Sequence, residues 1–155
     1  MDRTDRRLVA ALRADGRASY AELARAVGLS ASSVHERVTK LETAGVITGY
    51  RAVVDPVSVG IGVTAIVGIE PGENGQDDPI AAALDATPEV ESCYQVAGDN
   101  AFVVVVRVAD IEELSQVLGR LRAIPGVART RTTVVLSTVF EGRPRPDRPP
   151  TDGGS

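Results

Sequence analysis

Hydroxyl and basic side chains recur along residues 30–41 at the spacing of one side of a helix. Val34, Val38 and Leu41 follow one another at i, i+4 and i+7, which predicts a buried apolar stripe. The outward side chains include those of Ser32, Ser33, His35, Arg37 and Lys40. Serine hydroxyls bond bases or phosphates, and arginine and lysine neutralise phosphates or bind guanine. The segment is therefore a candidate for insertion into a DNA major groove, with these five residues as contacts.

Each candidate also has a plainer interpretation as a solvated position on a helix. Arg37 is next to the inward-facing Val38, so it is also suited to hold a carboxylate of its own chain. Tyr50 and Arg51 come after the helices and are further candidates for contact with backbone phosphates. The alternative for Tyr50 is packing between domains. Arg51 and the five helix residues together form the predicted DNA-binding set.

The elements that position this helix are predicted to form a helix-turn-helix. Ser19 and Glu22 have the spacing of a capping box, which starts a helix just before an apolar stripe. Gly28 supplies the backbone freedom for a sharp exit, and Ser30 caps the next helix. An opening helix is expected over about residues 2–14. This arrangement places the polar front of residues 30–41 on the surface of a three-helix unit.

Two short β-prone runs surround Thr48 and Gly49, over residues 46–54. They are typical of the wing of a winged helix-turn-helix, with the second run leading out as a connecting strand. Asp55-Pro56 then breaks the chain and marks a domain boundary. We therefore expect a DNA-binding domain over residues 1–50 and a connecting strand and linker over residues 51–61.

The rest of the chain alternates strand-like and helical patterns. Strands are expected at 62–69, 90–97, 102–108 and 129–140, and helices from Asp78-Pro79 to Ala86 and from Asp110 to Ile124. The order β-α-β-β-α-β is that of a ferredoxin-like domain, here residues 62–141. Residues 142–155 are rich in proline, glycine and charge and are predicted to be a disordered tail. The expected fold class is α+β, a winged helix-turn-helix followed by a ferredoxin-like domain.

The strand at Phe102–Val108 is apolar on both faces. Two helices cover only one face of a four-stranded antiparallel sheet, so the second apolar face needs another cover. A second copy of the same sheet is the simplest cover. We therefore predict a homodimer formed through the sheets.

Composition narrows the remaining classes of function. The net charge of −4 divides unevenly, with +3 in residues 1–51 and −8 in residues 52–141, so the basic charge accompanies the helix pair. Cys93 is the single cysteine and is expected to pack in a sheet face. No cofactor or metal site and no catalytic pairing of histidine with a carboxylate is predicted. No apolar run is long enough for a membrane span, and a reduced cytoplasmic protein is expected.

The whole pattern resembles the Lrp/AsnC (leucine-responsive, feast/famine) transcriptional regulators. The resemblance covers about residues 2–141. It is carried by Glu22-Leu-Ala-Arg-Ala-Val-Gly28-Leu-Ser30, by the run from Arg37 to Tyr50, by Cys93-Tyr-Gln-Val-Ala-Gly98-Asp99 and by Pro125-Gly126-Val-Ala-Arg-Thr130-Arg-Thr132. It implies a sequence-specific regulator that binds double-stranded DNA. It also implies a homodimer that assembles further, often to an octamer, and an amino-acid effector bound between effector domains.

The resemblance also implies an effector loop at Gly98, Asp99, Asn100 and Ala101. Asp99 is the candidate acceptor for the effector's ammonium, and backbone N–H groups near Gly98 are candidate donors to its carboxylate. Thr130, Thr132 and Thr133 of a neighbouring subunit are further candidates. Asn100-Ala101 departs from the family's aromatic residue and acid at this place. The alternative interpretation of the loop is a tight β-turn that uses glycine and asparagine for its backbone geometry.

Two other functions remain as alternatives. One is a metabolite-binding ferredoxin-like oligomer whose helix pair has only a structural role. The other is an enzyme, since sirohaem decarboxylases resemble the same two-domain architecture. That chemistry favours basic and histidine side chains in the second domain, whereas His35 lies in the first and residues 52–141 are acidic.

Overall fold

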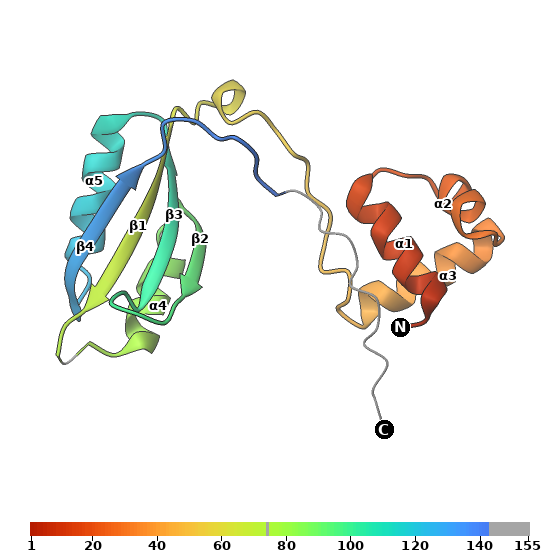
Figure 1. The fold of residues 1–155 in the computed structure, drawn as a ribbon, viewed down its shortest axis with the longest axis horizontal. Coiled ribbons are helices and arrows are strands. Elements are labelled where there is room, and N and C mark those ends of the chain that lie inside the picture. The colour runs from red at the N-terminus through yellow and green to blue at the C-terminus, as the bar shows by residue number, and fades with distance from the viewer. Residues whose placement is uncertain (74, 143–155) are drawn as a thin grey trace. The chain divides into compact units, whose positions relative to one another are not determined.

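The structure is a computed structural model that describes residues 1–73 and 75–142. The described chain divides into two compact units, residues 1–53 with 140–142 and residues 54–139 (Figure 1). The first contains three helices and the second a four-stranded sheet with two helices. The expected α+β class, a helix-turn-helix followed by a ferredoxin-like domain, is confirmed. Of the predicted tail, residues 143–155 lie outside the described part of the chain.

The first unit consists of α1 (Arg3–Ala14), α2 (Tyr20–Val27) and α3 (Ala31–Thr43). Each helix has a side chain that accepts a hydrogen bond from a backbone N–H of its first turn, and these N-cap residues are Asp2, Ser19 and Ser30. The predicted capping box of Ser19 and Glu22 is confirmed. Gly28 ends α2 with a φ of 77°, a left-handed conformation that glycine adopts without steric cost.

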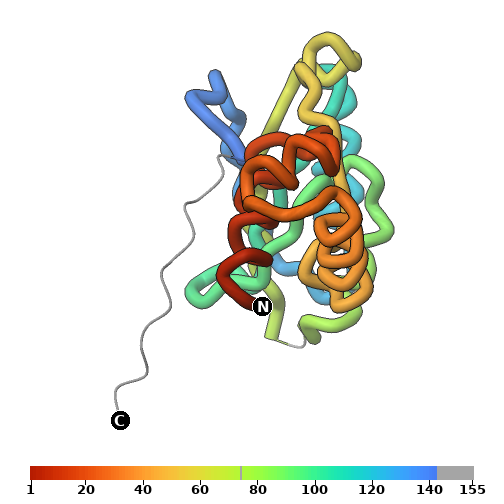
Figure 2. The backbone as a smooth tube through the Cα atoms, turned by 90° about the vertical axis from the view of Figure 1, so that its right-hand side faces the viewer, coloured from red at the N-terminus to blue at the C-terminus, as the bar shows by residue number. Residues whose placement is uncertain are grey.

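The three helices lie against one another, as the red to orange part of Figure 2 shows. Their shared core is small. Leu8 of α1, Leu23 of α2 and Val34 and Val38 of α3 are at most 1% exposed. Leu41 is also buried, so the predicted inward stripe of the third helix is confirmed. Burial of this stripe fixes which side of α3 remains in solvent.

The predicted wing strands are wrong, because residues 46–54 contain no strand. The backbone N–H groups of Val46 and Ile47 instead donate to the carbonyl of Leu41, at 2.9 and 3.1 Å. Both bonds go to this one carbonyl near the end of α3, so the two N–H groups are not available for a strand ladder. Ile47 packs on the helical core. The segment after α3 is thus anchored to the helices.

The second unit contains a sheet in the order β2-β3-β1-β4, with all neighbours antiparallel (Figure 1). The strands are β1 (Val63–Pro71), β2 (Val90–Gln95), β3 (Phe102–Val108) and β4 (Val127–Val134). The helices are α4 (Asp77–Asp85) and α5 (Ile111–Arg122), and a 3-10 turn, Val57–Val59, precedes β1. This is the expected β-α-β-β-α-β order.

Both helices pack on the same face of the sheet. Ile80 and Leu84 of α4 and Val117 and Leu121 of α5 are fully buried against that face. The sheet contributes alternate residues, Ala65, Val67 and Ile69 of β1 and Phe102, Val104, Val106 and Val108 of β3. The intervening residues point to the other face, as the period of two in a strand requires. That second face is called the open face below.

Some predicted ends of elements are wrong. The last strand ends at Val134, and Phe140 lies beyond it. Val134 pairs with Ala65, and β1 begins at Val63, so the continuing chain has almost no partner strand left. The second strand ends at Gln95. The first helix of this unit begins at Asp77, one residue before the predicted start at Asp78, and its N-cap Gln76 makes no capping hydrogen bond with its side chain.

Candidate nucleic-acid interface and effector region

The N-terminus of α3 is held by a small network of serine hydroxyls. The Ser30 hydroxyl accepts from the Ser33 backbone N–H at 3.2 Å and donates to the Ser33 hydroxyl at 2.9 Å. The hydroxyl of Ser32 lies 3.1 Å from that of Ser30. Ser32 is exposed and Ser33 half-buried. The network orients both predicted DNA contacts and leaves Ser32 open to solvent.

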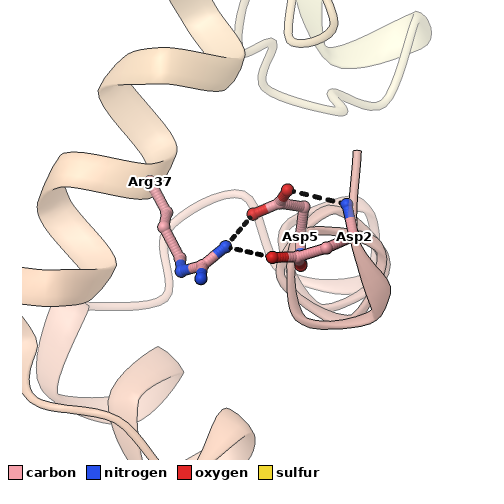
Figure 3. A network of polar contacts seen from close by, with 3 residues as sticks. All are labelled: Asp2, Asp5 and Arg37. Atoms are coloured by element: carbon pink, nitrogen blue, oxygen red, sulfur yellow. Dashed lines mark hydrogen bonds and ion pairs between the residues drawn. The ribbon is translucent and has the colours of Figure 1, made fainter.

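Arg37 is engaged within its own unit. Its Nη1 donates to Asp2 Oδ2 and to Asp5 Oδ1, both at 2.7 Å, and the side chain reaches from α3 to the first turn of α1 (Figure 3). Asp2 and Asp5 also cap α1 reciprocally, each accepting the other's backbone N–H. We call Asp2, Asp5 and Arg37 the clasp. The alternative that Arg37 holds carboxylates of its own chain is the one present in the structure.

The electrostatics of the clasp follow from these bonds. The pKa of Asp2 is lowered, first by the hydrogen bond from the Asp5 backbone N–H and then by that from Arg37. The pKa of Arg37 is raised, first by its bond to Asp2 and then by its bond to Asp5. Each shift favours the charged form. The clasp therefore joins α3 to the start of α1 through two charged hydrogen bonds.

Tyr50 and His35 are held on the opposite flank of α3. The Tyr50 hydroxyl donates to Glu42 Oε1 at 2.8 Å, and burial together with this bond raises the pKa of Tyr50 to about 12. The Tyr50 ring lies close to Gly16, so the chain after α3 is fastened to the helices. The ring of His35 packs edge-on against that of Tyr20, with centroids 5.1 Å apart. His35 is exposed beside this contact.

Lys40 and Arg51 are both exposed, and neither makes a hydrogen bond or ion pair with the described residues. The structure thus brings Ser32, Ser33 and Lys40 together on α3 as available polar side chains. It places His35 on a flank, Arg37 in the clasp and Arg51 beyond Tyr50. Sequence reasoning missed Asp2, Asp5 and Glu42, although the Asp2–Asp5 spacing is itself a capping signal.

The predicted effector loop closes the hairpin between β2 and β3. Ala101 accepts from the Val96 N–H at 2.9 Å and donates its own N–H to the carbonyl of Ile69 at 2.9 Å. Gly98 has a φ of 130°, and Asp99 is exposed. Gly98 is the only residue of the loop with a positive φ, so Asn100 does not take the left-handed geometry that the β-turn interpretation assigns to it. The Asp99 carboxylate is exposed to solvent.

Asn100 lies across the open face at Gly68. A Cβ on Gly68 would stand 2.6 Å from Asn100 Oδ1, so a larger residue there would displace the Asn100 side chain. Asn100 Oδ1 is buried and has no hydrogen-bond partner in the described residues. Asn100 therefore covers the end of the open face nearest the loop, where the family resemblance places the aromatic residue and acid.

The three candidate threonines do not share a face of the sheet. Thr130 pairs with Ile69 and Thr132 with Val67, so both stand on the face covered by the helices and are half-buried. Thr133 pairs with Ile66 and stands exposed on the open face. Thr130 is the one level with the end of the effector loop, because Ile69 also accepts from Ala101.

The open face is apolar at its centre. Ile66 of β1 pairs with Val105 of β3, and Gly68 pairs with Val103. Tyr94 of β2 pairs with Val103 and is 57% exposed. In the described part of the chain no helix covers the open face.

Cys93, predicted to pack in a sheet face, is exposed on the edge strand β2, and partial burial raises the pKa of its thiol.

Two family models match the chain, one in each unit. The AsnC-type helix-turn-helix domain matches residues 1–42, and the Lrp/AsnC ligand binding domain matches residues 64–145. The chain belongs to the Lrp/AsnC family. It is a transcriptional regulator of that type with a DNA-binding helix-turn-helix, as the resemblance implied.

Its similarity to characterised members extends over nearly the whole chain. The HTH-type transcriptional regulator LrpA of Mycobacterium tuberculosis is 46% identical over 143 residues, 92% of this chain and 95% of that protein. The leucine-responsive regulatory protein of Salmonella typhimurium is 36% identical over 142 residues, 90% of this chain and 87% of that protein. Both relatives are transcriptional regulators, which favours a regulatory over an enzymatic function for this chain.

Solved structures of the family have the same fold. The feast or famine regulatory protein of M. tuberculosis complexed with L-methionine matches with a TM-score of 0.87 at 45% identity, covering 93% of this chain and 97% of that one. A transcriptional regulator–L-methionine complex from Neisseria meningitidis matches with a TM-score of 0.83 at 29% identity, covering 91% and 93%. Separately, no helix within residues 1–73 and 75–142 has the length and hydropathy to cross a membrane.

Proposed function

We propose that this Lrp/AsnC regulator binds double-stranded DNA in a sequence-specific manner through α3. The observation that carries the proposal is the division of α3 into a buried stripe and a polar front. Burial of Val34, Val38 and Leu41 leaves Ser32 and Lys40 exposed to solvent and Ser33 half-buried beside them. His35 and Arg51 are proposed as contacts at the edges of the interface, and Arg37 acts by positioning α3. Such a regulator acts in the cytoplasm, beside the chromosome.

The proposed active form is a dimer of the open faces, with further assembly to an octamer. The exposed Ile66, the half-buried Val103 and Val105 and the exposed Tyr94 form one apolar surface in the second unit. A two-fold dimer presents two α3 helices, so its half-sites are expected about 34 Å apart or at a multiple of that distance. Further assembly adds weak contacts by multivalency.

The proposed effector is a free amino acid bound between effector domains. L-methionine is bound in two related regulators, which supports this class of ligand. In this chain Asp99 is the proposed acceptor for the ammonium, with Gly98, Asn100 and Ala101 completing the loop. Thr130, Thr132 and Thr133 are proposed to contribute from a neighbouring subunit. Because Thr133 faces the opposite side from the other two, only some of the three can serve one ligand.

Selection from a random duplex library, followed by anisotropy titrations across a range of salt, tests DNA binding. We expect one enriched sequence bound at submicromolar Kd, with affinity that falls as salt increases. Failure to enrich any sequence and binding to no duplex would favour the metabolite-binding alternative.

Calorimetric titration with each of the twenty amino acids tests the effector. We expect one or a few to bind the wild type, and Asp99→Ala to weaken that binding at least tenfold. Serine substitution of Thr133 serves as a milder comparison. Unchanged binding in Asp99→Ala would assign the loop to its β-turn role alone.

A further inference from the structure

The side of α3 that faces directly away from the core contains one acidic residue. Ser32, Glu36, Thr39 and Thr43 are exposed and follow one another at spacings of four, three and four residues, so they form one stripe. Ser32, Glu36 and Thr39 each come two residues before a buried residue, Val34, Val38 and Leu41 respectively, which puts them on nearly the opposite side of the helix. We call these four residues the outer stripe. Glu36 is its only charged member.

Glu36 is exposed, and two cations, Arg37 and Lys40, stand within four residues of it on the same helix. It makes no hydrogen bond or ion pair within the described residues, although Lys40 stands at the i+4 spacing that favours one. The neighbouring Arg37 is held by Asp2 and Asp5 and turns toward α1 (Figure 3). A free carboxylate on a surface that approaches phosphates opposes DNA binding unless it gains a specific partner. Removal of its charge is therefore expected to strengthen non-specific binding.

The chemistry of the outer stripe points to that partner. Serine and threonine hydroxyls both donate and accept, so Ser32 and Thr39 tolerate several base edges. An ionised carboxylate only accepts. In the major groove it matches the exocyclic amino groups of cytosine N4 and adenine N6, and it repels the acceptors of guanine and thymine. Glu36 is thus the one residue of the outer stripe that discriminates strictly between bases.

We propose that Glu36 is a specificity-determining residue that accepts a hydrogen bond from an exocyclic amino group of the operator, cytosine N4 in the first instance. The proposal rests on the proposed DNA-binding function and adds to it the base chemistry that α3 selects. Glu36 lowers affinity for DNA in general and restores it only where an amino group is present. Its role is discrimination, in contrast to that of Lys40, which attracts any sequence.

The test compares wild type, Glu36→Ala and a matched control in selection from a random duplex library. Glu42→Gln is the control, because it removes the same charge from the same helix off the outer stripe and its amide still accepts from Tyr50. We expect the wild type and Glu42→Gln to share one preference. Glu36→Ala should lose it at one base pair per half-site and bind scrambled DNA several-fold more tightly.

An atomic substitution in the selected site identifies the group. Replacement of the selected cytosine by 2-pyrimidinone deletes only the N4 amino group. This is expected to weaken wild-type binding about tenfold and Glu36→Ala binding less than twofold. If adenine is selected in place of cytosine, Glu36 accepts the hydrogen bond from adenine N6, and the proposal of an exocyclic amino group stands. An unchanged preference in Glu36→Ala, or an equal loss of affinity in the wild type and Glu36→Ala when the amino group is deleted, would overturn the proposal. If the wild type selects no sequence, the proposed DNA-binding function fails with it.

Discussion

The two units of this regulator differ in the kind of surface that they expose to solvent. The helical unit has a cluster of five buried residues with Leu41 buried as well, and the side of α3 that faces solvent is polar. The sheet unit has a core of twelve buried residues, yet one apolar face of its sheet remains uncovered. Solvent-exposed polar groups suit a charged, hydrated partner such as DNA, and an uncovered apolar face suits a second protein surface. This difference supports the proposal that the helical unit binds DNA and that the sheet unit mediates assembly.

Core truncation is expected to have the largest effect, and only in the helical unit. Leu8→Ala should cost about 2–5 kcal/mol, a large share of the stability of so small a unit. We expect loss of DNA binding and of part of the helical signal in circular dichroism, with the sheet assembly retained in sedimentation. Leu84→Ala in the larger core is the comparison. One shared thermal transition that moves as a whole in both variants would show that the units are not independent.

A charge on the open face should prevent assembly. Ile66 is 43% exposed in the isolated chain, so Ile66→Asp is compatible with the fold of the sheet unit. Burial of an unpaired carboxylate at an interface should weaken the dimer at least about 100-fold. Ile111→Asp, at an exposed position on α5, is the control and should leave the dimer intact. Sedimentation of Ile66→Asp as an unchanged dimer would remove the open face as the interface.

Truncation of Lys40 should weaken binding to every duplex by a similar factor. Because Lys40 is proposed to meet a phosphate, Lys40→Ala should reduce the slope of log K against log salt by about 1. Anisotropy titrations at several salt concentrations on selected and scrambled DNA measure this slope. A loss restricted to the selected sequence would instead assign Lys40 to a base.

Removal of the clasp should act on stability and its dependence on pH. A lowered pKa means that Asp2 stabilises the fold above the ordinary aspartate pKa of about 3.9. That stabilisation is lost as the pH falls through the lower pKa of the folded state. Arg37→Ala should therefore lower the thermal midpoint of the helical unit at pH 7 and reduce the loss on acidification. Equal midpoints for wild type and Arg37→Ala at pH 7 would contradict the positioning role.

The smallest effect is expected at Tyr50. Tyr50→Phe should cost about 1 kcal/mol through the lost bond to Glu42. A raised pKa means that the protonated tyrosine stabilises the fold below about pH 10 and that this is lost between about pH 10 and about pH 12. Tyrosinate absorbance should show a step near pH 12 in the wild type that is missing in Tyr50→Phe. Retention of that step would assign it to another tyrosine.

Local signals predicted most of the fold. The caps at Ser19 and Ser30 and the stripe of Val34, Val38 and Leu41 depend on neighbours within a few residues, so the helices follow from the sequence. The alternation in Phe102–Val108 likewise predicted a sheet with a second apolar face. Features that depend on residues distant in the sequence were harder to predict. The end of β4 depends on where β1 begins. The predicted wing strand is absent because two of its N–H groups donate to the carbonyl of Leu41.

The site was predicted only in part for the same reason. Its residue type makes Arg37 a candidate DNA contact, whereas its bond to Asp2 joins residues 35 positions apart, and no local pattern reveals it. Thr132 and Thr133 are adjacent in sequence but stand on opposite faces of the sheet, which depends on register. Residue type therefore indicated the chemistry, and the three-dimensional contacts decided which residues are free to perform it.

The most direct test of the division between units is anisotropy of the protein on DNA from upstream of its own gene and on a scrambled duplex, with and without a pooled amino-acid mixture. We expect submicromolar, salt-sensitive binding that prefers the true sequence, and a change in affinity when the mixture is added. Binding that is indifferent to sequence and unchanged by amino acids would contradict a regulator in which the sheet unit controls the helical one.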